Sequence, residues 1–539
     1  MPASDATHES RTVVTHHSTT PPQTTILDDT AKRSRLRSVL LVITVTLGMI
    51  TNLATSTGCS VIVPVIGQDL NVAEGEIQWI VSAYTLACGC LLIPLGRIAD
   101  LYGSKKMFII GTLWLAAFTI GCGFAPNIAT LNVLRAMAGI GPAAFMPSCI
   151  GILASSFPPS RARSAAFAIF ASGAPIGGAV GTQLGALLAQ KTSITWRSPF
   201  FLFAGFAGLC AILGFLVIDA DRPLGPEVDR RVDWIGSFLI TAGLVCVTFA
   251  LGEGTVASQG WRTPYVIVLL ILGVLLVGVF QFWQLRLEAH PGPGRFSPPP
   301  LLKPSLWSRA NGKFTVMQMI AFFEWAAFIS WFFWVQVYYQ EYVGYSPIRT
   351  AVRLLPTTIS GVICTLFVMV VVAHVDVLVI VLLGTFFTGI AALLFALVDP
   401  SAVYWAFGFP STTLGVFGAD FVFTAGTLYI AKIALPEEQS LAGGLFQTLN
   451  QLGSAFGLAL TTIAHNSARR GPEFTPDILP YRASQWTSFG LAILCKPSLS
   501  LASGQALIVA LIVAPMLTRP SFHSVFPSTR LSPRRWCRG

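Results

Sequence analysis

Apolar stretches long enough to cross a lipid bilayer recur along almost the whole chain. A transmembrane helix needs about 20 predominantly apolar residues, and about fourteen such stretches follow one another. They cover residues 38–66, 78–101, 106–125, 129–154, 162–188, 198–218, 233–253, 264–285, 314–339, 350–372, 375–398, 403–431, 440–464 and 488–516. Only 11% of the 539 residues are charged, whereas a soluble chain has about 25%. The sequence therefore predicts an all-α polytopic membrane protein with about fourteen transmembrane helices and the lipid bilayer as its main partner.

The basic residues lie in short clusters between the apolar stretches. The net charge is +10, but no single polar domain collects it, so we expect no nucleic acid partner. If both termini are cytoplasmic, roughly 22 basic residues fall on the cytoplasmic side and about 6 on the other side, in agreement with the positive-inside rule. Residues 1–37 are polar and rich in Ser and Thr, which predicts a disordered cytoplasmic tail.

The predicted helices divide into groups of six, two and six. We expect an N-terminal six-helix bundle over residues 38–218, two extra helices and a cytoplasmic linker over 219–312, a C-terminal six-helix bundle over 313–517, and a basic tail over 518–539. Two six-helix halves are typical of transporters that bind their substrate between the halves, near the middle of the bilayer. The layout therefore predicts a substrate site between the two halves.

The stretch "GRIADLYGSKK" places charges between the second and third predicted helices, on the cytoplasmic side. Asp100 lies at the C-terminal end of a helix, where an anion is unfavourable, so it needs a partner such as Arg97, Lys105 or a helix N-terminus. A charge cluster that forms and breaks between two bundles can act as a latch for one of two states. The alternative is simple positive-inside anchoring. The latch candidates are Gly96, Arg97, Asp100, Gly103, Lys105 and Lys106.

The order of these residues resembles the cytoplasmic loop signature of the major facilitator superfamily. Three other stretches resemble motifs of the same family, in the same order. "LNVLRAMAGIG" is similar to the fourth-helix motif with an intramembrane arginine, here Arg135. "GAPIGGAVG" is similar to the fifth-helix motif typical of antiporters, with Ala-Pro in place of the usual Gly-Pro, and "QWIVSAYTLACGCLL" resembles the second helix of the fourteen-spanner drug:proton antiporters. The antiporter motif would comprise Gly173, Pro175, Gly177, Gly178 and Gly181.

The resemblance extends over roughly residues 38–490 and is best for fungal members of that group. It implies alternating access driven by a proton gradient, with no other cofactor, and export of a small organic molecule such as a drug, toxin or secondary metabolite. It places Arg135 beside the cavity, where it influences the binding of protons or substrate. We expect a monomer in the plasma membrane or, as the alternative, the vacuolar membrane, with both termini cytoplasmic.

Two carboxylates lie in the middle of predicted helices of the second half, Glu324 and Asp420. An ionisable group deep in a membrane costs roughly 2.5–3.5 kcal/mol on insertion scales. Such a group is tolerated where it lines a cavity and carries a proton, or where it bonds to a neighbouring helix, and both readings stay open. Side chains on the same helical faces are candidates for a substrate cavity, although an aromatic belt at the membrane surface explains some of them equally well. They are Phe328, Trp331, Tyr338 and Thr424.

Glycines recur every four residues on the fifth predicted helix, at Gly173, Gly177, Gly181 and Gly185. They form a flat face on which another helix can pack closely, and Pro175 adds a bend. Static packing and a hinge that changes between states are both consistent with this pattern.

Other features leave the function open. The first predicted helix lacks the aspartate that many fourteen-spanner antiporters carry there, which excludes proton coupling through that position. This makes a low-affinity carrier of a small solute such as ammonium or borate the main alternative, and a transport-dead membrane sensor a further one. The sequence shows no metal-ligand cluster, G-x-S-x-G motif or phosphate loop, so we do not expect an enzyme.

The resemblance fades after about Gln485, and Lys496-Pro497 is costly within a membrane helix. A divergent last helix and a mispredicted splice junction both explain this ending.

Overall fold

The computed structural model describes residues 34–501, except for gaps at 72–78, 159, 222–228, 255–256, 258, 291, 293–296, 372–374, 376, 436–437 and 470–476. Every regular element among these residues is a helix, and none is a strand. The all-α prediction is therefore confirmed. The predicted basic tail at 518–539 lies outside the described residues, as does most of the predicted N-terminal tail.

The N-terminal half contains long helices that match the predicted stretches within a few residues. They are α2 (Arg35–Leu70), α4 (Trp79–Tyr102), α5 (Ser104–Gly123), α6 (Ile128–Ser156), α7 (Arg161–Lys191) and α8 (Ser198–Val217). Short polar residues set several starts, because their side chains accept a bond from an otherwise unpaired amide. Asn127 accepts from the amide of Thr130 before α6, and Ser160 accepts from the amide of Arg163 before α7.

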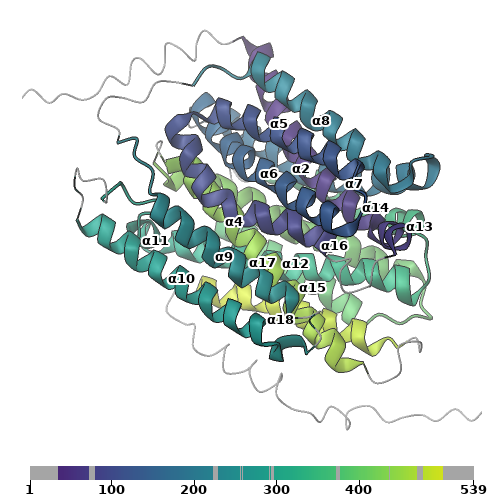
Figure 1. The fold of residues 1–539 in the computed structure, drawn as a ribbon. Coiled ribbons are helices and arrows are strands. Elements are labelled where there is room, and N and C mark those ends of the chain that lie inside the picture. Colours follow the sequence, from purple (N-terminus) through teal and green to yellow (C-terminus); the bar gives the residue numbers. More distant parts are fainter. Residues whose placement is uncertain are drawn as a thin grey trace, which may run out of the picture.

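Two further helices, α9 (Trp234–Glu253) and α10 (Pro264–Ala289), follow the first half. They pack against each other, and α9 also contacts α4 and α17. Figure 1 shows the pair along one side of the molecule, next to α4 and α17. The short helix α11 (Ser305–Ser308) lies in the linker that follows.

The C-terminal half consists of long helices interrupted by two short elements. They are α12 (Lys313–Val337), the π-helix η3 (Tyr338–Tyr342), α13 (Pro347–Arg353), α14 (Leu355–Val371), α15 (Val377–Ala396), α16 (Tyr404–Ile433), α17 (Gln439–Ala468) and α18 (Leu479–Leu501). The sequence predicts one helix over 350–372, but the structure divides this region at Leu354. Pro356 explains the break, because it has no amide hydrogen to donate to the carbonyl of Val352.

The predicted start of the last helix at residue 488 is wrong, because α18 begins at Leu479. Its first turns are polar and do not form an apolar stretch. Ser484 and Ser488 are nevertheless fully buried, and their hydroxyls donate to carbonyls one turn earlier in the helix. Polar residues satisfied in this way are compatible with a buried helix, and for that reason the apolar pattern misplaced the start.

Eleven helices of the described residues are long and apolar enough to cross a membrane. α14 has only 17 residues, and α17 and α18 contain several polar side chains. The count of fourteen transmembrane helices therefore stays a prediction.

The two halves meet mainly along two pairs of helices, and α6 also contacts α17 while α13 and α16 contact α7. Within the first half α2 packs on α7, and within the second half α12 packs on α17. Contacts between the halves join α4 to α17 and α7 to α14. In Figure 1 the first half lies above the second, with these four helices at their boundary. We call this boundary the seam.

Candidate functional site

Asp100 joins the two halves at one end of the seam. Its carboxylate accepts bonds from the backbone amides of Ser440 (3.2 Å) and Leu441 (3.0 Å), in the first turn of α17. A helix N-terminus carries unpaired amides and a partial positive charge, so it stabilises an anion. Gly96 lets the backbones approach, because a Cβ there would lie 3.1 Å from the carbonyl oxygen of Ser440. We call this end of the molecule the latch end.

The helix N-terminus is therefore the partner that the sequence left open for Asp100. Lys105 instead faces α8, where its ammonium donates to the carbonyls of Phe215 (2.9 Å) and Ile218 (2.6 Å). A cation at a helix C-terminus is favourable for the same electrostatic reason. No hydrogen bond or ion pair of the Arg97 side chain is seen within the described residues.

Asp221 completes the latch end on the side of α5. Its carboxylate accepts from the amides of Lys105 (2.8 Å) and Lys106 (3.2 Å), which caps the start of α5. Gly103 precedes that helix with a φ of 112°, and a Cβ there would lie 2.1 Å from Asp221 Oδ2. Only glycine fits this conformation without strain.

Arg135 is fully buried inside the N-terminal half. Its Nε donates to the carbonyl of Ile80 (2.8 Å), and its guanidinium lies 4.5 Å from the centre of the Tyr84 ring. Tyr84 in turn donates to Asn52 Oδ1 (2.8 Å). Both terminal nitrogens of Arg135 lack a hydrogen-bond partner within the part of the chain that the structure describes. A buried, incompletely paired guanidinium can bind an anion or a substrate acceptor atom.

The predicted antiporter motif on α7 faces two directions. Gly173, Gly177 and Gly181 pack on α2 of the same half, where a Cβ on Gly177 would lie 2.6 Å from the carbonyl oxygen of Ile50. Gly178 has open space, with no atom within 4 Å of a Cβ. Pro175 faces the other half, because its Cβ lies 2.4 Å from the position that a Cβ on Gly361 of α14 would occupy.

Asp420 lies beside this contact between the halves. It is only 8% exposed, and its Oδ2 has no hydrogen-bond partner among the described residues. A Cβ on Gly361 would be 2.9 Å from that oxygen and 2.4 Å from Pro175. Asp420, whose Oδ2 has no partner among the described residues, therefore lies close to Pro175 of α7, across a glycine of α14.

Glu324 has different surroundings, because it is enclosed within the C-terminal half. Its carboxylate accepts a hydrogen bond from the Thr388 hydroxyl of α15, and the Cys495 thiol of α18 lies 4.0 Å from Oε2. The side chain is fully buried. These contacts suit a carboxylate bonded to neighbouring helices of its own half. None of these contacts is made across the seam.

The predicted cavity residues are distributed over separate places. The fully buried Trp331 donates to the Ser411 hydroxyl (3.0 Å) inside the C-terminal half, and Phe328 packs on its ring. The hydroxyl of Thr424 is buried without a partner among the described residues. Tyr338 instead lines a cavity of about 430 Å³ together with Tyr345 and Arg353, at the end opposite the latch.

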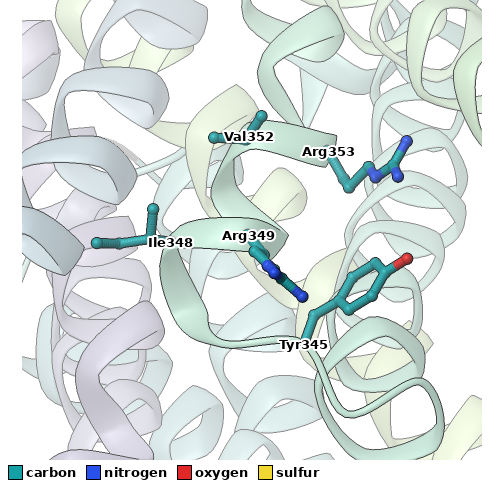
Figure 2. A pocket seen from close by; sticks show the side chains of 5 residues that line it. All are labelled: Tyr345, Ile348, Arg349, Val352 and Arg353. Atoms are coloured by element: carbon teal, nitrogen blue, oxygen red, sulfur yellow. The ribbon is translucent and has the colours of Figure 1, made fainter.

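The short helix α13 connects the halves at that opposite end. Gln183 of α7 donates to the carbonyl of Ala351 (3.0 Å). Figure 2 shows Ile348 pointing toward the N-terminal half, whereas Tyr345 and Arg353 point the other way. Ile348 packs on an apolar cluster of the first half that includes Trp196. A second cavity of about 300 Å³ lies around these residues.

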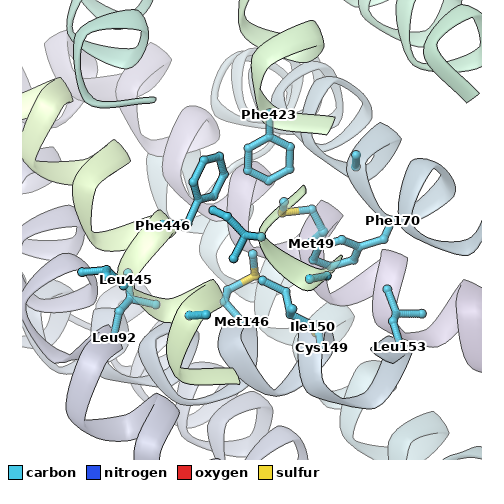
Figure 3. Packing of buried hydrophobic residues seen from close by; sticks show 14 of the residues in the cluster. Met49, Leu92, Met146, Cys149, Ile150, Leu153, Phe170, Phe423, Leu445 and Phe446 are labelled. Atoms are coloured by element: carbon cyan, nitrogen blue, oxygen red, sulfur yellow. The ribbon is translucent and has the colours of Figure 1, made fainter. Parts of the chain in front are cut away.

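Apolar side chains close the seam near the latch end. Figure 3 shows Met49 and Met146 of the first half beside Phe423 and Phe446 of the second half. All four are buried in one cluster. The halves thus touch at both ends of the seam in this conformation.

Two other buried acids, Asp233 and Glu438, were not recognised from the sequence. Glu438 pairs with Lys303 (2.5 Å) and Arg309 (3.2 Å) of the linker. Lys303 and Arg309 lie more than a hundred residues before Glu438, so no local sequence pattern connects these charges. Within the described residues, no group of three His, Cys, Asp or Glu side chains could hold a metal ion.

Several known proteins of similar sequence are transporters. The chain is 26% identical to "MFS-type transporter 1" of Pyricularia oryzae (86% of this chain, 83% of the relative). It is 27% identical to a low affinity ammonium transporter of Saccharomyces cerevisiae (78% and 79%) and 26% identical to "Efflux pump terG" of Aspergillus terreus (85% and 85%).

The fold is also similar to that of solved transporters. The human organic anion transporter MFSD10 superposes with a TM-score of 0.61 at 14% identity, over 85% of this chain and 98% of that one. The sequence profile described as "Major Facilitator Superfamily" matches residues 45–240 and 227–458, which is most of the chain. The protein is an integral multi-pass membrane transporter for a small molecule, not an enzyme, and it belongs to the Major Facilitator Superfamily.

Proposed function

We propose that this transporter exports small organic molecules, such as a drug, toxin or secondary metabolite, in exchange for protons. The observation that carries the proposal is the position of Asp420. A buried carboxylate without a partner among the described residues lies beside the contact between α7 and α14. An intramembrane carboxylate of this kind is a functional hypothesis by default.

The proton would couple to movement through the charge of Asp420. Keeping an ionised carboxylate inside a membrane costs roughly 2.5–3.5 kcal/mol. Protonation removes that cost, so it favours the conformation in which the seam around Asp420 is closed. Opening the seam to water favours release of the proton. Alternating exposure of the two ends would thus follow the proton gradient, which is the only energy source that we propose.

Release of the latch is the matching step at the other end. Asp100 and the first turn of α17 belong to different halves, so they separate when that end opens. Glu324 stays a second candidate for proton binding, and Arg135 a candidate for an effect on proton or substrate binding.

The apolar seam supports an organic substrate. Two methionines and two phenylalanines from opposite halves meet there. Methionine adapts to irregular apolar shapes, and aromatic rings stack on flat molecules. The similarity to an efflux pump of Aspergillus terreus agrees with this class of substrate.

The alternative is a low-affinity carrier of a small solute such as ammonium or borate. Similarity to the low affinity ammonium transporter of Saccharomyces cerevisiae, at 27% identity, favours it. For either function we propose a monomer in the plasma membrane, or alternatively the vacuolar membrane, with both termini cytoplasmic. A fluorescent fusion at each terminus, combined with protease protection, tests this placement.

Growth of a pump-deficient yeast that expresses this chain tests both functions. The panel contains antifungals, mycotoxins, ammonium analogues and borate, each with and without a proton uncoupler. Resistance to bulky organic compounds that the uncoupler removes is the expected result. A response confined to ammonium analogues or borate would favour the alternative, and resistance that survives the uncoupler would contradict proton coupling.

A further inference from the structure

We propose that Glu438 is a positioning residue of the latch, through which the two extra helices keep the latch end closed. Glu438 would act on the start of α17, and a linker of residues 301–309 would connect it to α9 and α10. The inference rests on the proposed alternating access, because a latch matters only if the halves separate there.

Glu438 directly precedes α17 but does not cap it. Its side chain makes no bond to the first amides of the helix. Instead it turns to the linker, where Lys303 Nζ lies 2.5 Å from Oε1 and Arg309 Nη1 lies 3.2 Å from Oε2. The glutamate is buried, whereas Lys303 remains 46% exposed. The first turn of α17 is thus left free to receive Asp100.

The linker is fixed on its other side to the extra helices. The amide of Leu302 donates to Gln284 Oε1 of α10 (3.1 Å). Leu301, Leu302 and Leu306 are nearly inaccessible, at 1–3% exposure. Because these leucines are buried, the segment that carries the two cations is anchored in the protein.

A second buried acid fixes the two extra helices to each other. Asp233 is 1% exposed and accepts from the amide of Gly236, from Trp283 Nε1 (3.0 Å) and from Gln284 Nε2 (2.7 Å). Gln284 therefore uses its amide nitrogen toward α9 and its oxygen toward the linker. This satisfied polar network makes α9, α10 and the linker one rigid support.

Opening the latch end would disturb this arrangement. When α17 moves away from Asp100, Glu438 either leaves its two cations or carries the linker with it. Removing the partners of a buried carboxylate is strongly unfavourable. The support thus stabilises the closed latch through a residue that does not itself touch Asp100.

A cysteine reporter measures the state of the latch end without any substrate. Leu445 of α17 is 3% exposed and lies in the apolar cluster at the seam. In the full-length Leu445→Cys protein, labelling by N-ethylmaleimide at this position is followed by peptide mass spectrometry. Residues 433–469 contain no native cysteine, so a label on that peptide reports Cys introduced at 445. Asp100→Asn provides the reference for an opened latch.

We expect Glu438→Gln to increase the labelling rate roughly fivefold, within the usual range of coupling between separate groups. The Lys303→Gln/Arg309→Gln double variant should match it, and combining all three changes should add little, because they remove the same interaction. Glu438→Asp should restore slow labelling in part. Glu437→Gln is the matched control, since it removes the same charge from the adjacent position in the sequence.

The proposal is overturned if Glu438→Gln labels at the parent rate, or if Glu437→Gln labels as fast as Glu438→Gln. If Glu438→Gln does not fold, the double variant of the partly exposed cations decides, and parent-like labelling of that variant also refutes the proposal. Labelling is independent of substrate, so a changed rate together with an inactive growth panel would refute the proposed export but not the latch support.

Discussion

The two buried carboxylates of the second half differ in what surrounds them. Glu324 receives a hydrogen bond from Thr388 inside its own bundle. Asp420 Oδ2 has no partner among the described residues and lies close to Pro175 of the other half. A bonded carboxylate serves packing well, whereas an unpartnered one at a moving boundary is better suited to gain and lose a proton.

Asp420→Asn should reduce efflux driven by an imposed pH gradient to the level of vesicles without the protein. Asparagine keeps the size of the side chain but cannot take up the proton. The measurement is substrate efflux from reconstituted vesicles, with the amount of folded protein checked by size-exclusion chromatography. Glu324→Gln is the comparison, and we expect it to retain coupled efflux. If only Glu324→Gln abolished coupling, the assignment of the two carboxylates would be reversed.

The ion pairs of Glu438 should be visible in the pH dependence of stability. Burial raises the pKa of this carboxyl, but the hydrogen bond and charge of Lys303, helped by Arg309, outweigh burial and hold the pKa below its usual range. A group with a lowered pKa stabilises the fold above its unfolded-state pKa of about 4.3, and this contribution is lost as the pH falls through the folded-state pKa. We therefore expect the thermal unfolding temperature of the purified protein to fall more steeply below about pH 4.5 than that of Glu438→Gln. Parallel curves would show that these pairs contribute nothing measurable.

Among the helices, the packing of α2 on α7 follows most directly from a sequence pattern. The glycine row of α7 predicted a flat face, and Gly173, Gly177 and Gly181 do lie against α2. The packing partner belongs to the same half, which agrees with static packing for these three positions. Pro175 faces α14 of the other half, so a hinge at this contact would act through the proline.

Two neighbouring glycines of α7 provide a matched test of this packing. A Cβ on Gly177 would be 2.6 Å from the carbonyl oxygen of Ile50, so Gly177→Ala should push α2 and α7 apart and cost about 1–3 kcal/mol. Gly178 has open space around it, so Gly178→Ala should be neutral or stabilise the helix by up to about 1 kcal/mol. Thermal unfolding of both variants in detergent, followed by intrinsic fluorescence, measures the difference. Equal unfolding temperatures would contradict close packing of α2 on α7.

The sequence predicted helices better than it predicted which faces meet. Long apolar stretches located most helices within a few residues, because the bilayer demands them. The polar start of α18 and the break at Leu354 were missed, since satisfied serines and a single proline leave no apolar signal. The surroundings of Glu324 and Asp420 were not predictable, because both faces of a buried membrane helix are apolar and look alike in the sequence.

Across the whole molecule, contacts far apart in the chain decide the state of the two ends. Asp100 and Ser440 are separated by 340 positions, and Gln183 and Ala351 by 168. Sequence patterns could show that Asp100 needs a partner but not which of the candidates would supply it. The present conformation has both ends joined, and transport by alternating access requires each connection to break in turn.

A covalent cross-link between the two halves at the end opposite the latch should therefore stop transport. Gln183 Nε2 lies 3.0 Å from the carbonyl oxygen of Ala351, so cysteines at both positions can be bridged by a short bis-methanethiosulfonate reagent. We expect efflux from vesicles containing the Gln183→Cys/Ala351→Cys protein to cease after cross-linking and to return after reduction with dithiothreitol. Each single-cysteine variant, treated identically, is the control. Undiminished efflux by the fully cross-linked protein would exclude opening at this end.

The attachment of Leu302 to α10 also limits how much of the linker can extend between the two halves. The chain from residue 285 to residue 312 could stretch to roughly 95 Å, but the ten residues after Leu302 reach at most about 35 Å. A linker this short would permit the second half to rotate slightly against the first. It would not permit the second half to separate from the first or to invert. In the proposed alternating access, the same helices would therefore face each other again each time the seam closes.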